Sequence, residues 1–399
     1  MDVIEGITLD LEVERILPGG LGLAHAAGRT VLVSLAAPGD RLTVKIDRVR
    51  GKVAFASLVE IQRPSPLRIE PPCPYFGRCG GCDFQQLSYE AQLQAKSEII
   101  RDCLHRIARI QSPPEVRVVA SPNEWRYRSR ANWQVDPEMK RVGYYERGTH
   151  TVCDVADCAV LVPELQQTLE GIRALLPDGL PNETRELEAV CGDTGVSLAP
   201  ETAGFRTEDI TRKIGSEKYQ FSATSFFQTN HDLLEAFTAS VIAEAHGQSA
   251  IDLYCGVGLF TLPLARRFSQ VVGVEANPNA ALYARANVKN AGLLNAKIVT
   301  ARVGEWLNQH GASIRRLDLV LLDPPRTGAE PGVIQGLVTL KPARIAYVSC
   351  DPATLARDLK QLLSAGYAMQ SIVAFDMFPQ THHVETVVHL QKDEYEKLK

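Results

Sequence analysis

Residues 1–62 alternate between apolar and polar positions in short runs, and each run ends at a turn rich in glycine or proline. Runs of this length and period predict β-strands, and several in succession predict a small antiparallel barrel. The oligonucleotide-binding barrel fits this pattern, although other small β modules share it. Pro64-Ser65-Pro66 interrupts the alternation, so we expect the first domain to end just before it.

From about residue 221 onward the pattern changes to buried strand, turn and helix, repeated. The predicted strands are 249–254, 270–274, 317–322, 344–348 and 386–390. A helix is predicted over 260–268, after a glycine turn. Strands that alternate with helices predict an α/β fold with a doubly wound parallel sheet over 221–399. Sheets of this class bind ligands at the carboxyl ends of their strands.

Residues 63–220 mix strand and helix patterns and predict a central α/β domain, in which 88–110 form one amphipathic helix. Residues 124–133 alternate at the strand period, which would place Arg126, Arg128 and Arg130 on one face. These arginines could bind RNA phosphates while the aromatic residues of the same stretch, Trp125, Tyr127 and Trp133, stack on bases. An exposed strand with a charged face gives the same pattern, so both interpretations stay open.

A chain of 399 residues is too long for one ordinary hydrophobic core and predicts two or three domains. Hydrophobic residues make up 45% and charged residues 23%, as in globular proteins, and no apolar run reaches the length of a membrane helix. The first residues lack the features of a signal peptide, so we expect a cytoplasmic protein, and a monomer. A net charge of -4 gives no global nucleic-acid signature, so contacts to RNA would come from local basic patches.

Nine cysteines, an odd number, favour thiol chemistry or metal ligation over a disulfide framework. Cys73, Cys79 and Cys82 form a C-x5-C-x2-C run among glycines, which predicts a metal or iron–sulfur site. An all-cysteine site needs a fourth ligand, and the spacing does not separate zinc from iron–sulfur. The candidates for the fourth ligand are Cys103, Cys153, Cys158 and Cys191. Cys103 is disfavoured because its predicted helix points away from the cysteine run.

The turn after strand 249–254 contains Gly256 and Gly258, and the next strand ends at Glu275. Glycines let the backbone approach a ligand, and an acidic residue at this point can accept hydrogen bonds from ribose hydroxyls. A dinucleotide-binding turn would have a third glycine where Thr261 stands. We therefore favour S-adenosylmethionine over NAD as the cofactor.

Strand 317–322 ends at Asp323-Pro324-Pro325-Arg326, which resembles a motif of nucleobase methyltransferases. Enzymes that methylate exocyclic amines usually have an aromatic residue where Arg326 stands, which disfavours that reaction. C5 of a pyrimidine becomes nucleophilic only after a thiolate adds to C6, and Cys350 after strand 344–348 is the candidate thiol. Glu385, before the last strand, is the candidate base for the C5 proton. A buried structural cysteine and a polar strand cap are the plain alternatives at these two positions.

Together these motifs resemble those of the RNA uracil-C5 methyltransferase family. The resemblance runs nearly end to end and is carried by the barrel pattern, the cysteine run, the glycine turn, residues 323–328, Ser349-Cys350 and residues 376–385. It implies a TRAM-like barrel of the oligonucleotide-binding type over 1–62 and a Rossmann-like S-adenosylmethionine methyltransferase domain over 221–399. It further implies that structured RNA is the partner, and that Cys350 and Glu385 catalyse methylation of uridine at C5.

The resemblance also implies roles that spacing alone does not assign. It implies a [4Fe-4S] cluster on Cys73, Cys79, Cys82 and Cys158, and helix 88–110 packed on the catalytic domain, so that the central domain over 63–220 is discontinuous. The implied cofactor contacts are Gln228, Tyr254, Gly256, Gly258, Glu275 and Asp323. The expected RNA contacts are Arg126, Arg128, Arg130 and Arg326.

Two positions depart from the family's pattern: Leu259 and Asp351 stand where relatives often have asparagine. The first of these asparagines touches the methionine end of the cofactor in relatives, so we assign Leu259 no cofactor role. Ribosomal RNA is favoured over tRNA as the target, because the cysteine run and barrel occur together in bacterial ribosomal RNA enzymes of the family. Methylation of cytosine C5, and a cluster-sensing RNA-binding protein without turnover, are the alternatives.

Overall fold

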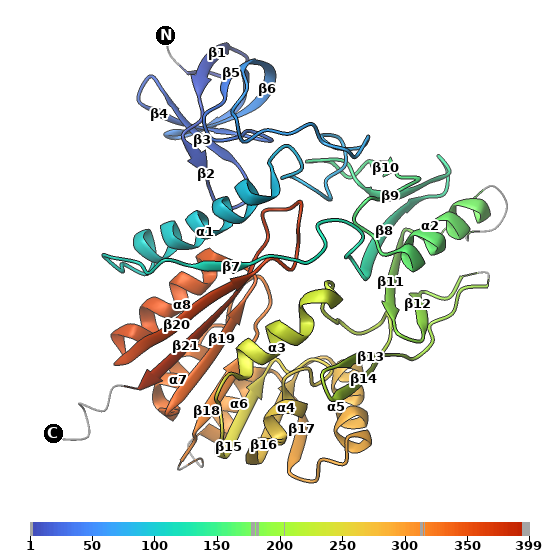
Figure 1. Ribbon diagram of the computed structural model, residues 1–399, viewed down its shortest axis with the longest axis vertical. Helices are drawn as coiled ribbons and strands as arrows, with labels where there is room; N and C mark the ends of the chain where they lie inside the picture. The colour runs from blue at the N-terminus through green and yellow to red at the C-terminus, as the bar shows by residue number, and fades with distance from the viewer. Residues whose placement is uncertain are drawn as a thin grey trace.

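The computed structural model describes residues 3–176, 180, 183–202, 204–311, 314 and 316–392. Residues 1–2 and 393–399, which belong to the first and last expected domains, lie outside the described residues. Figure 1 shows a small N-terminal β unit beside a long helix, a central region with smaller sheets, and a large C-terminal sheet. Among the described helices, none is both long and apolar enough to span a membrane.

The N-terminal unit is a six-stranded sheet in the order β1-β5-β6-β4-β3-β2. Its strands are β1 Thr8–Glu12, β2 Arg15–Ile16, β3 Gly22–Ala26, β4 Arg29–Val33, β5 Arg41–Arg50 and β6 Val53–Arg63. All neighbours are antiparallel except β4 and β6, which are parallel. β5 and β6 are paired through several bulges, which bend the two strands around the core. Wholly buried Val31, Val33 and Leu42 fill that core.

The C-terminal part folds around an eight-stranded sheet in the order β17-β16-β15-β18-β19-β21-β20-β7. Its strands are β15 Gly247–Leu253, β16 Phe268–Glu275, β17 Ala296–Thr300, β18 Leu319–Leu322, β19 Arg344–Ser349, β20 Tyr367–Phe375 and β21 Glu385–Lys392, with β7 Arg117–Val119. The strands from β17 to β19 are parallel, whereas β21 is antiparallel to both of its neighbours. Because β21 is reversed, its first residue lies at the same edge of the sheet as the last residues of the parallel strands.

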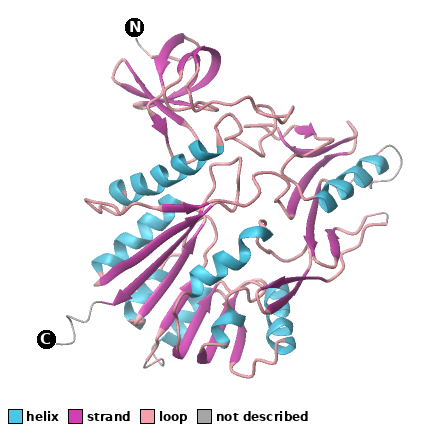
Figure 2. Cartoon of the chain, viewed as in Figure 1, coloured by secondary structure: helices cyan, strands magenta, loops and turns pink. Residues whose placement is uncertain are grey.

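Helices cover both faces of this sheet (Figure 2). One face packs against α3 Leu234–Ile242, α4 Thr261–Ala265 and α5 Pro278–Asn290, and a 3-10 helix, η1 His231–Leu233, precedes α3. The other face packs against α6 Val303–His310, α7 Val333–Leu340 and α8 Pro352–Ser364. The helix predicted over 260–268 is shorter than expected, because β16 already begins at Phe268.

The central region contains a five-stranded antiparallel sheet in the order β10-β9-β8-β11-β12, and a separate hairpin of β13 and β14. These strands are β8 Arg130–Asp136, β9 Arg141–Tyr145, β10 Val152–Asp154, β11 Glu186–Gly192, β12 Gly195–Ala199, β13 Ile210–Ile214 and β14 Glu217–Phe221. Helix α2, Pro163–Leu175, packs on the five-stranded sheet. Leu165, Leu169 and Ile172 of α2 share an apolar cluster with the wholly buried Trp133.

Two elements that precede the central sheets pack with the C-terminal part. Helix α1, Tyr89–Arg106, is capped by Ser88, whose side chain accepts a hydrogen bond from the Ala91 N–H. Ile100 of α1 lies in the same apolar cluster as Tyr347 of β19. Strand β7 extends the large sheet by pairing in parallel with β20. The large sheet and its covering helices are therefore built from two stretches of chain that are separated by the central sheets.

The strand predicted over 124–133 begins only at Arg130. Arg126 has a φ of 54°, which breaks the extended backbone that a strand needs. Tyr127 and Trp133 are wholly buried, and the Tyr127 hydroxyl donates a 2.8 Å hydrogen bond to the Pro379 carbonyl. The prediction that these two rings stack on RNA bases is therefore wrong, because tertiary packing places both of them in the core.

Candidate active site and cysteine cavity

Residues from five strands of the large sheet meet at one edge. Tyr254 follows β15, Glu275 ends β16, Asp323 follows β18 and Cys350 follows β19. Glu385 begins the reversed strand β21 and therefore lies at the same edge. This edge is where open α/β sheets bind their ligands.

The turn after β15 has a backbone shape that glycine adopts most easily. Gly256 and Gly258 have φ values of 55° and 92°. The Gly256 N–H donates to Glu275 Oε2 at 2.9 Å, and the Asn277 N–H donates to Glu275 Oε1 at 2.7 Å. These two donors orient the carboxylate, while each of its oxygens keeps a lone pair for a ribose hydroxyl. The turn and Glu275 are therefore suited to hold the adenosine part of a cofactor.

Two acidic side chains with raised pKa values lie next to this turn. Asp252 is wholly buried, and its Oδ2 accepts a 2.5 Å hydrogen bond from the Thr261 hydroxyl. Burial raises the pKa of Asp252 to about 7; the charges of Asp323 and Glu275 add to the rise, and the Thr261 hydroxyl opposes it. Burial also raises the pKa of Asp323 to about 7. Thr261 stands where a dinucleotide-binding turn would have its third glycine, and its hydroxyl is the hydrogen-bond partner of the buried Asp252 carboxyl group.

Cys350 lies between β19 and α8. Asp351 caps α8, since its Oδ1 accepts hydrogen bonds from the Ala353 and Thr354 N–H groups at 2.9 and 2.8 Å. Asp351, one of the two positions that depart from the family's pattern, therefore has a structural function as a helix cap. Because the cap fixes the start of the helix, it also fixes the backbone that carries Cys350.

The Cys350 thiol is surrounded by charged groups of both signs. Burial raises the pKa of this thiol to about 12, with the Glu385 and Asp323 carboxylates adding to the rise and the Arg326 guanidinium opposing it. The thiol of the substrate-free protein is therefore protonated at neutral pH. Arg326, whose side chain is exposed, is the cation that favours its ionisation.

Glu385 is buried at the start of β21, with 4% of its surface exposed. Burial raises the pKa of its carboxyl group well above the usual range; the charge of Asp323 adds to the rise, and Arg326 opposes it. Within the described part of the chain, Glu385 Oε2 has no hydrogen-bond partner. A buried, poorly solvated carboxylate with a raised pKa is suited to accept a proton from a bound ligand.

The segment between β14 and α3 brings two further side chains into view. Gln228 is buried, and its Oε1 has no hydrogen-bond partner among the described residues. Phe226 is 60% exposed, and its ring lies 5.8 Å from the guanidinium carbon of Arg130. An exposed aromatic ring held in this way is a candidate surface for base stacking that the sequence pattern did not single out.

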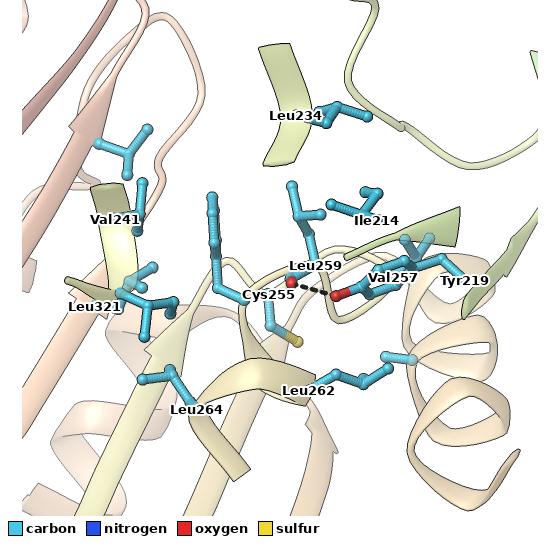
Figure 3. Close-up of a cluster of buried hydrophobic side chains, with 14 of the residues drawn as sticks. Ile214, Tyr219, Leu234, Val241, Cys255, Val257, Leu259, Leu262, Leu264 and Leu321 are labelled. Carbon is cyan, nitrogen blue, oxygen red and sulfur yellow. Dashed lines mark hydrogen bonds between the residues drawn. The ribbon is translucent and has the colours of Figure 1, made fainter. Parts of the chain in front are cut away.

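Leu259 belongs to the apolar core, as Figure 3 shows. Its side chain lies among those of Ile214, Leu234 and Val257, and 8% of its surface is exposed. The Leu259 carbonyl accepts a 2.9 Å hydrogen bond from the wholly buried hydroxyl of Tyr219. The leucine is thus held by packing in the core.

Four of the cysteines line one cavity of about 30 Å³ in the central region. Three of them, Cys73, Cys79 and Cys82, come from the loop before α1, and Cys158 comes from the loop before α2. Burial raises the pKa values of Cys79 and Cys82 to about 12 and also raises that of Cys158. The residues that line the cavity include no aspartate, glutamate or histidine.

The other candidates for a fourth ligand lie elsewhere. Cys103 and Cys191 are buried in separate apolar clusters. Cys153 is buried beside the cavity without lining it, and its sulfur accepts a 3.3 Å hydrogen bond from Arg78 Nε. In the described part of the chain, no set of three or more histidine, cysteine, aspartate or glutamate side chains has the arrangement that holds a single metal ion. The metal or cluster therefore stays a prediction.

The three arginines of residues 126–130 do not form one exposed row, so that part of the prediction is wrong. Arg126 is exposed and donates to the Cys158 carbonyl at 3.1 Å, whereas Arg128 lines the cysteine cavity. Arg130 donates to the Ser225 carbonyl at 2.8 Å and pairs with Glu188. Their contact with RNA, like that of Arg326, stays a prediction.

Comparisons with known proteins agree with this architecture. A parallel sheet with one reversed strand, a glycine turn after its central strand and an acidic residue closing the next define the S-adenosylmethionine-dependent methyltransferase class. Residues 207–393 match the family model described as tRNA (Uracil-5-)-methyltransferase, and residues 3–59 match the TRAM domain.

Relatives match the chain over nearly its whole length. It is 33% identical to the 23S rRNA (uracil(1939)-C(5))-methyltransferase RlmD of Pseudomonas putida, over 94% of this chain and 92% of that one. It is 31% identical to an uncharacterized RNA methyltransferase of Thermosynechococcus vestitus, over 97% and 98% of the two chains. The crystal structure of the tRNA (uracil-54, C5)-methyltransferase of Pyrococcus abyssi, in complex with S-adenosyl-L-homocysteine, superposes with a TM-score of 0.74 at 29% identity, covering 95% of this chain and 100% of that one.

The chain therefore belongs to the RNA uracil-C5 methyltransferase family. It is an S-adenosylmethionine-dependent RNA methyltransferase with an N-terminal TRAM domain. The predicted family, fold class and cofactor S-adenosylmethionine are confirmed.

Proposed function

We propose that the protein transfers a methyl group from S-adenosylmethionine to C5 of one uridine in RNA, with Cys350 as nucleophile and Glu385 as base. The observation that carries this proposal is the meeting of these two side chains at the sheet edge that also carries Glu275 and Asp323. Covalent addition and proton removal need both groups within reach of one pyrimidine ring. The uridine must leave its stack, because C6 is approached from one face of the ring.

Each proposed step has a residue in this chain. The Cys350 thiolate forms a bond to C6, and the electron pair of the C5–C6 double bond moves into an enolate. C5 of the enolate then attacks the methyl carbon, and the sulfonium of the cofactor leaves as neutral thioether. Glu385 takes the proton from C5, and the electrons of that C–H bond restore the double bond as the cysteine sulfur leaves C6.

The resting protein has its thiol protonated, so Cys350 has to lose its proton to water as the substrates bind. Arg326 lowers the pKa of Cys350, whereas the carboxylates of Glu385 and Asp323 raise it. A bound S-adenosylmethionine adds a positive sulfonium near these groups and shifts the balance toward the thiolate. The cofactor would be held by the glycine turn, Glu275, Tyr254, Gln228 and Asp323.

Ribosomal RNA is the proposed target. One support is the 33% identity to a 23S rRNA enzyme over 94% of this chain. The other is that this chain has both the cysteine run, residues 73–82, and the N-terminal barrel. A tRNA is the second candidate, because the superposed structure of 29% identity acts on a tRNA uracil. Trapping with 5-fluorouridine transcripts of the two RNAs distinguishes these targets.

We also propose that Cys73, Cys79, Cys82 and Cys158 hold a [4Fe-4S] cluster with a structural role. In support, the four thiols share one cavity whose lining offers no other acidic or imidazole ligand. Thiolates around such a cluster each bind a different iron, so they stand further apart than the ligands of a single ion. When bound, the cluster would cross-link the loop before α1 to the loop before α2.

The decisive test is mass spectrometry of the protein mixed with S-adenosylmethionine and transcripts in which uridine is replaced by 5-fluorouridine. Fluorine at C5 cannot leave as a proton, so the methylated adduct stays attached to the cysteine. We expect an adduct that maps to Cys350, is absent in Cys350→Ala, and persists in Cys191→Ala, which removes another thiol whose pKa is raised by burial. The RNA that traps fastest identifies the target. Trapping by 5-fluorocytidine alone would replace uridine by cytosine, and binding without any trapping would leave a non-catalytic RNA-binding protein.

A further inference from the structure

Residues from before the central sheets make most of the long-range hydrogen bonds to residues 376–384, the loop that leads to Glu385. Wholly buried Lys96 of α1 donates from Nζ to Asp376 Oδ1 at 2.5 Å and to the Phe378 carbonyl at 3.1 Å. The Tyr127 hydroxyl donates to the Pro379 carbonyl at 2.8 Å. Residues outside the neighbouring strands β19 and β20 thus position the backbone that leads to Glu385.

Gln380, in the middle of this loop, has a left-handed φ of 68° and is fixed from several sides. Its side-chain oxygen accepts a 3.0 Å hydrogen bond from Gln92 Nε2, and its N–H donates to Gln92 Oε1 at 2.9 Å. Its carbonyl accepts hydrogen bonds from the Asp83 and Phe84 N–H groups at 3.1 and 3.0 Å. Asp83, the residue after Cys82, therefore contacts the loop 376–384 directly.

A further contact between the two loops joins Asp83 to His382. Asp83 Oδ1 accepts from the His382 N–H at 2.8 Å, and Asp83 Oδ2 lies 2.5 Å from His382 Nδ1. Both side chains are largely buried, with 15% and 25% of their surfaces exposed. One carboxylate thus fixes both the backbone and the ring of a residue three positions before Glu385.

The barrel also reaches this point. An added Cβ at Gly20, which has a φ of 76°, would lie 3.1 Å from the His382 Cβ and 3.2 Å from Asp83 Oδ2. The glycine turn of the barrel therefore packs directly on the Asp83–His382 pair. Three segments that are distant in sequence therefore meet at Asp83 and His382. They are the barrel turn at Gly20, the loop that contains Cys73, Cys79 and Cys82 (the cysteine loop), and the loop 376–384.

We propose that Asp83 is a positioning residue for Glu385, which acts through His382 and makes proton removal from C5 depend on the folded cysteine loop. This inference rests on the proposed function. A carboxylate that must reach one C–H bond tolerates little displacement, and a shift of about 1 Å can cost about 100-fold in rate. Thiolate addition and methyl transfer use Cys350 and the cofactor turn, so they do not depend on the Asp83 contact.

The test compares two reactions of Asp83→Ala. With 5-fluorouridine RNA, which needs no proton removal, we expect trapping at a rate close to that of the wild type. With natural RNA in a single turnover, we expect the methylated covalent adduct to accumulate and its release to slow by roughly 10- to 100-fold. Glu385→Gln gives the reference for a reaction stopped at this step.

Asp318→Ala is the matched control. Asp318 is as buried as Asp83, with 16% of its side chain exposed, and its carboxylate also accepts backbone N–H groups, from Gln248 and Ser249 at 2.6 and 3.0 Å. It lies just before β18, at the opposite end of that strand from Asp323. The control variant should release its product at the wild-type rate.

His382 supplies a second pair of variants. His382→Ala should accumulate the adduct as Asp83→Ala does, and His382→Asn, whose amide can still donate to Asp83, should restore release. Equal losses of trapping and release in Asp83→Ala would indicate a merely structural residue and overturn the inference, as would normal release in both alanine variants. If the wild type fails to trap 5-fluorouridine RNA at all, the proposed function fails first, which separates the two results.

Discussion

Ser349 of β19 and Thr386 of β21 face each other in register in the large sheet. Because the two strands are antiparallel, continuing the register by one residue sets Cys350 opposite Glu385. One strand pairing thus places the proposed nucleophile and the proposed base, although 34 residues of sequence lie between Cys350 and Glu385. A pyrimidine ring between them would meet the thiol on C6 and the carboxylate at C5.

Glu385→Gln should stop the reaction after methyl transfer. The amide keeps the shape of the side chain but accepts no proton, so a methylated adduct on Cys350 should accumulate with natural uridine RNA. We expect turnover to fall by about 100- to 10,000-fold, the usual contribution of a general base. Denaturing electrophoresis and mass spectrometry of the protein–RNA adduct measure it. Free methylated RNA released at the wild-type rate would assign the base to another residue.

Alkylation of Cys350 should report its raised pKa. Only the thiolate reacts with iodoacetamide, and a pKa of about 12 leaves the thiolate as a small fraction at every pH in the usual range. We expect the rate at the Cys350 peptide to rise about tenfold per pH unit from pH 7 to pH 10 without a plateau. Arg326→Ala should slow labelling throughout, because that cation lowers the pKa of the thiol. A plateau above about pH 9 would mean that burial does not raise the pKa of the thiol.

Asp323 should make the cofactor-free protein less stable as the pH rises. Its folded pKa of about 7 exceeds the ordinary value of 3.8, so the folded state holds this proton more tightly. The contribution is fully present below about pH 4 and is lost as the pH rises through about 7. Asp323→Asn carries no such proton, so its free energy of unfolding should exceed that of the wild type increasingly from pH 4.5 to pH 8.

We expect this difference to reach the order of 2 kcal/mol, since one pKa unit corresponds to about 1.4 kcal/mol and partial exposure reduces the effect. Urea unfolding of both proteins at the two pH values measures it. Parallel stability curves for wild type and Asp323→Asn would contradict the prediction.

Protein purified without oxygen should contain four iron and four sulfide per chain if the cysteine cavity holds a [4Fe-4S] cluster. Cys158→Ser should lose most of this iron, whereas Cys153→Ser should keep it, because Cys153 is buried beside the cavity without lining it. Iron and sulfide analysis, with the visible absorption spectrum, gives the answer. Stoichiometric zinc in the wild type would replace the cluster by a zinc site.

Several features could be predicted from the order of residues because they are local. Short alternating runs predicted the barrel, and strand–turn–helix alternation predicted the parallel sheet. The carboxyl ends of parallel strands share one edge, so the sequence alone predicts that Glu275, Asp323 and Cys350 lie near each other. The positive φ values at Gly256 and Gly258 agree with the role that a glycine turn requires.

Other features depended on contacts between distant segments. Helical spacing placed Lys96 in α1 but could not show that its ammonium is buried against Asp376, 280 positions away. Strand alternation around Arg126 failed, because burial of Tyr127 in the core outweighed the local preference for extended backbone. The spacing of the cysteines left the fourth ligand open among four, since spacing says nothing of which loop folds back.

The sequence by itself thus determined the kinds of elements and the chemistry that their ends can perform, because these follow from side-chain periodicity and residue type. Only the tertiary structure decided which distant groups share an environment: Cys158 with the cysteine run, Asp83 with His382, and Glu385 with Cys350. The physical reason is that burial and long-range hydrogen bonds, which set pKa values and positions, arise from the packing of whole elements.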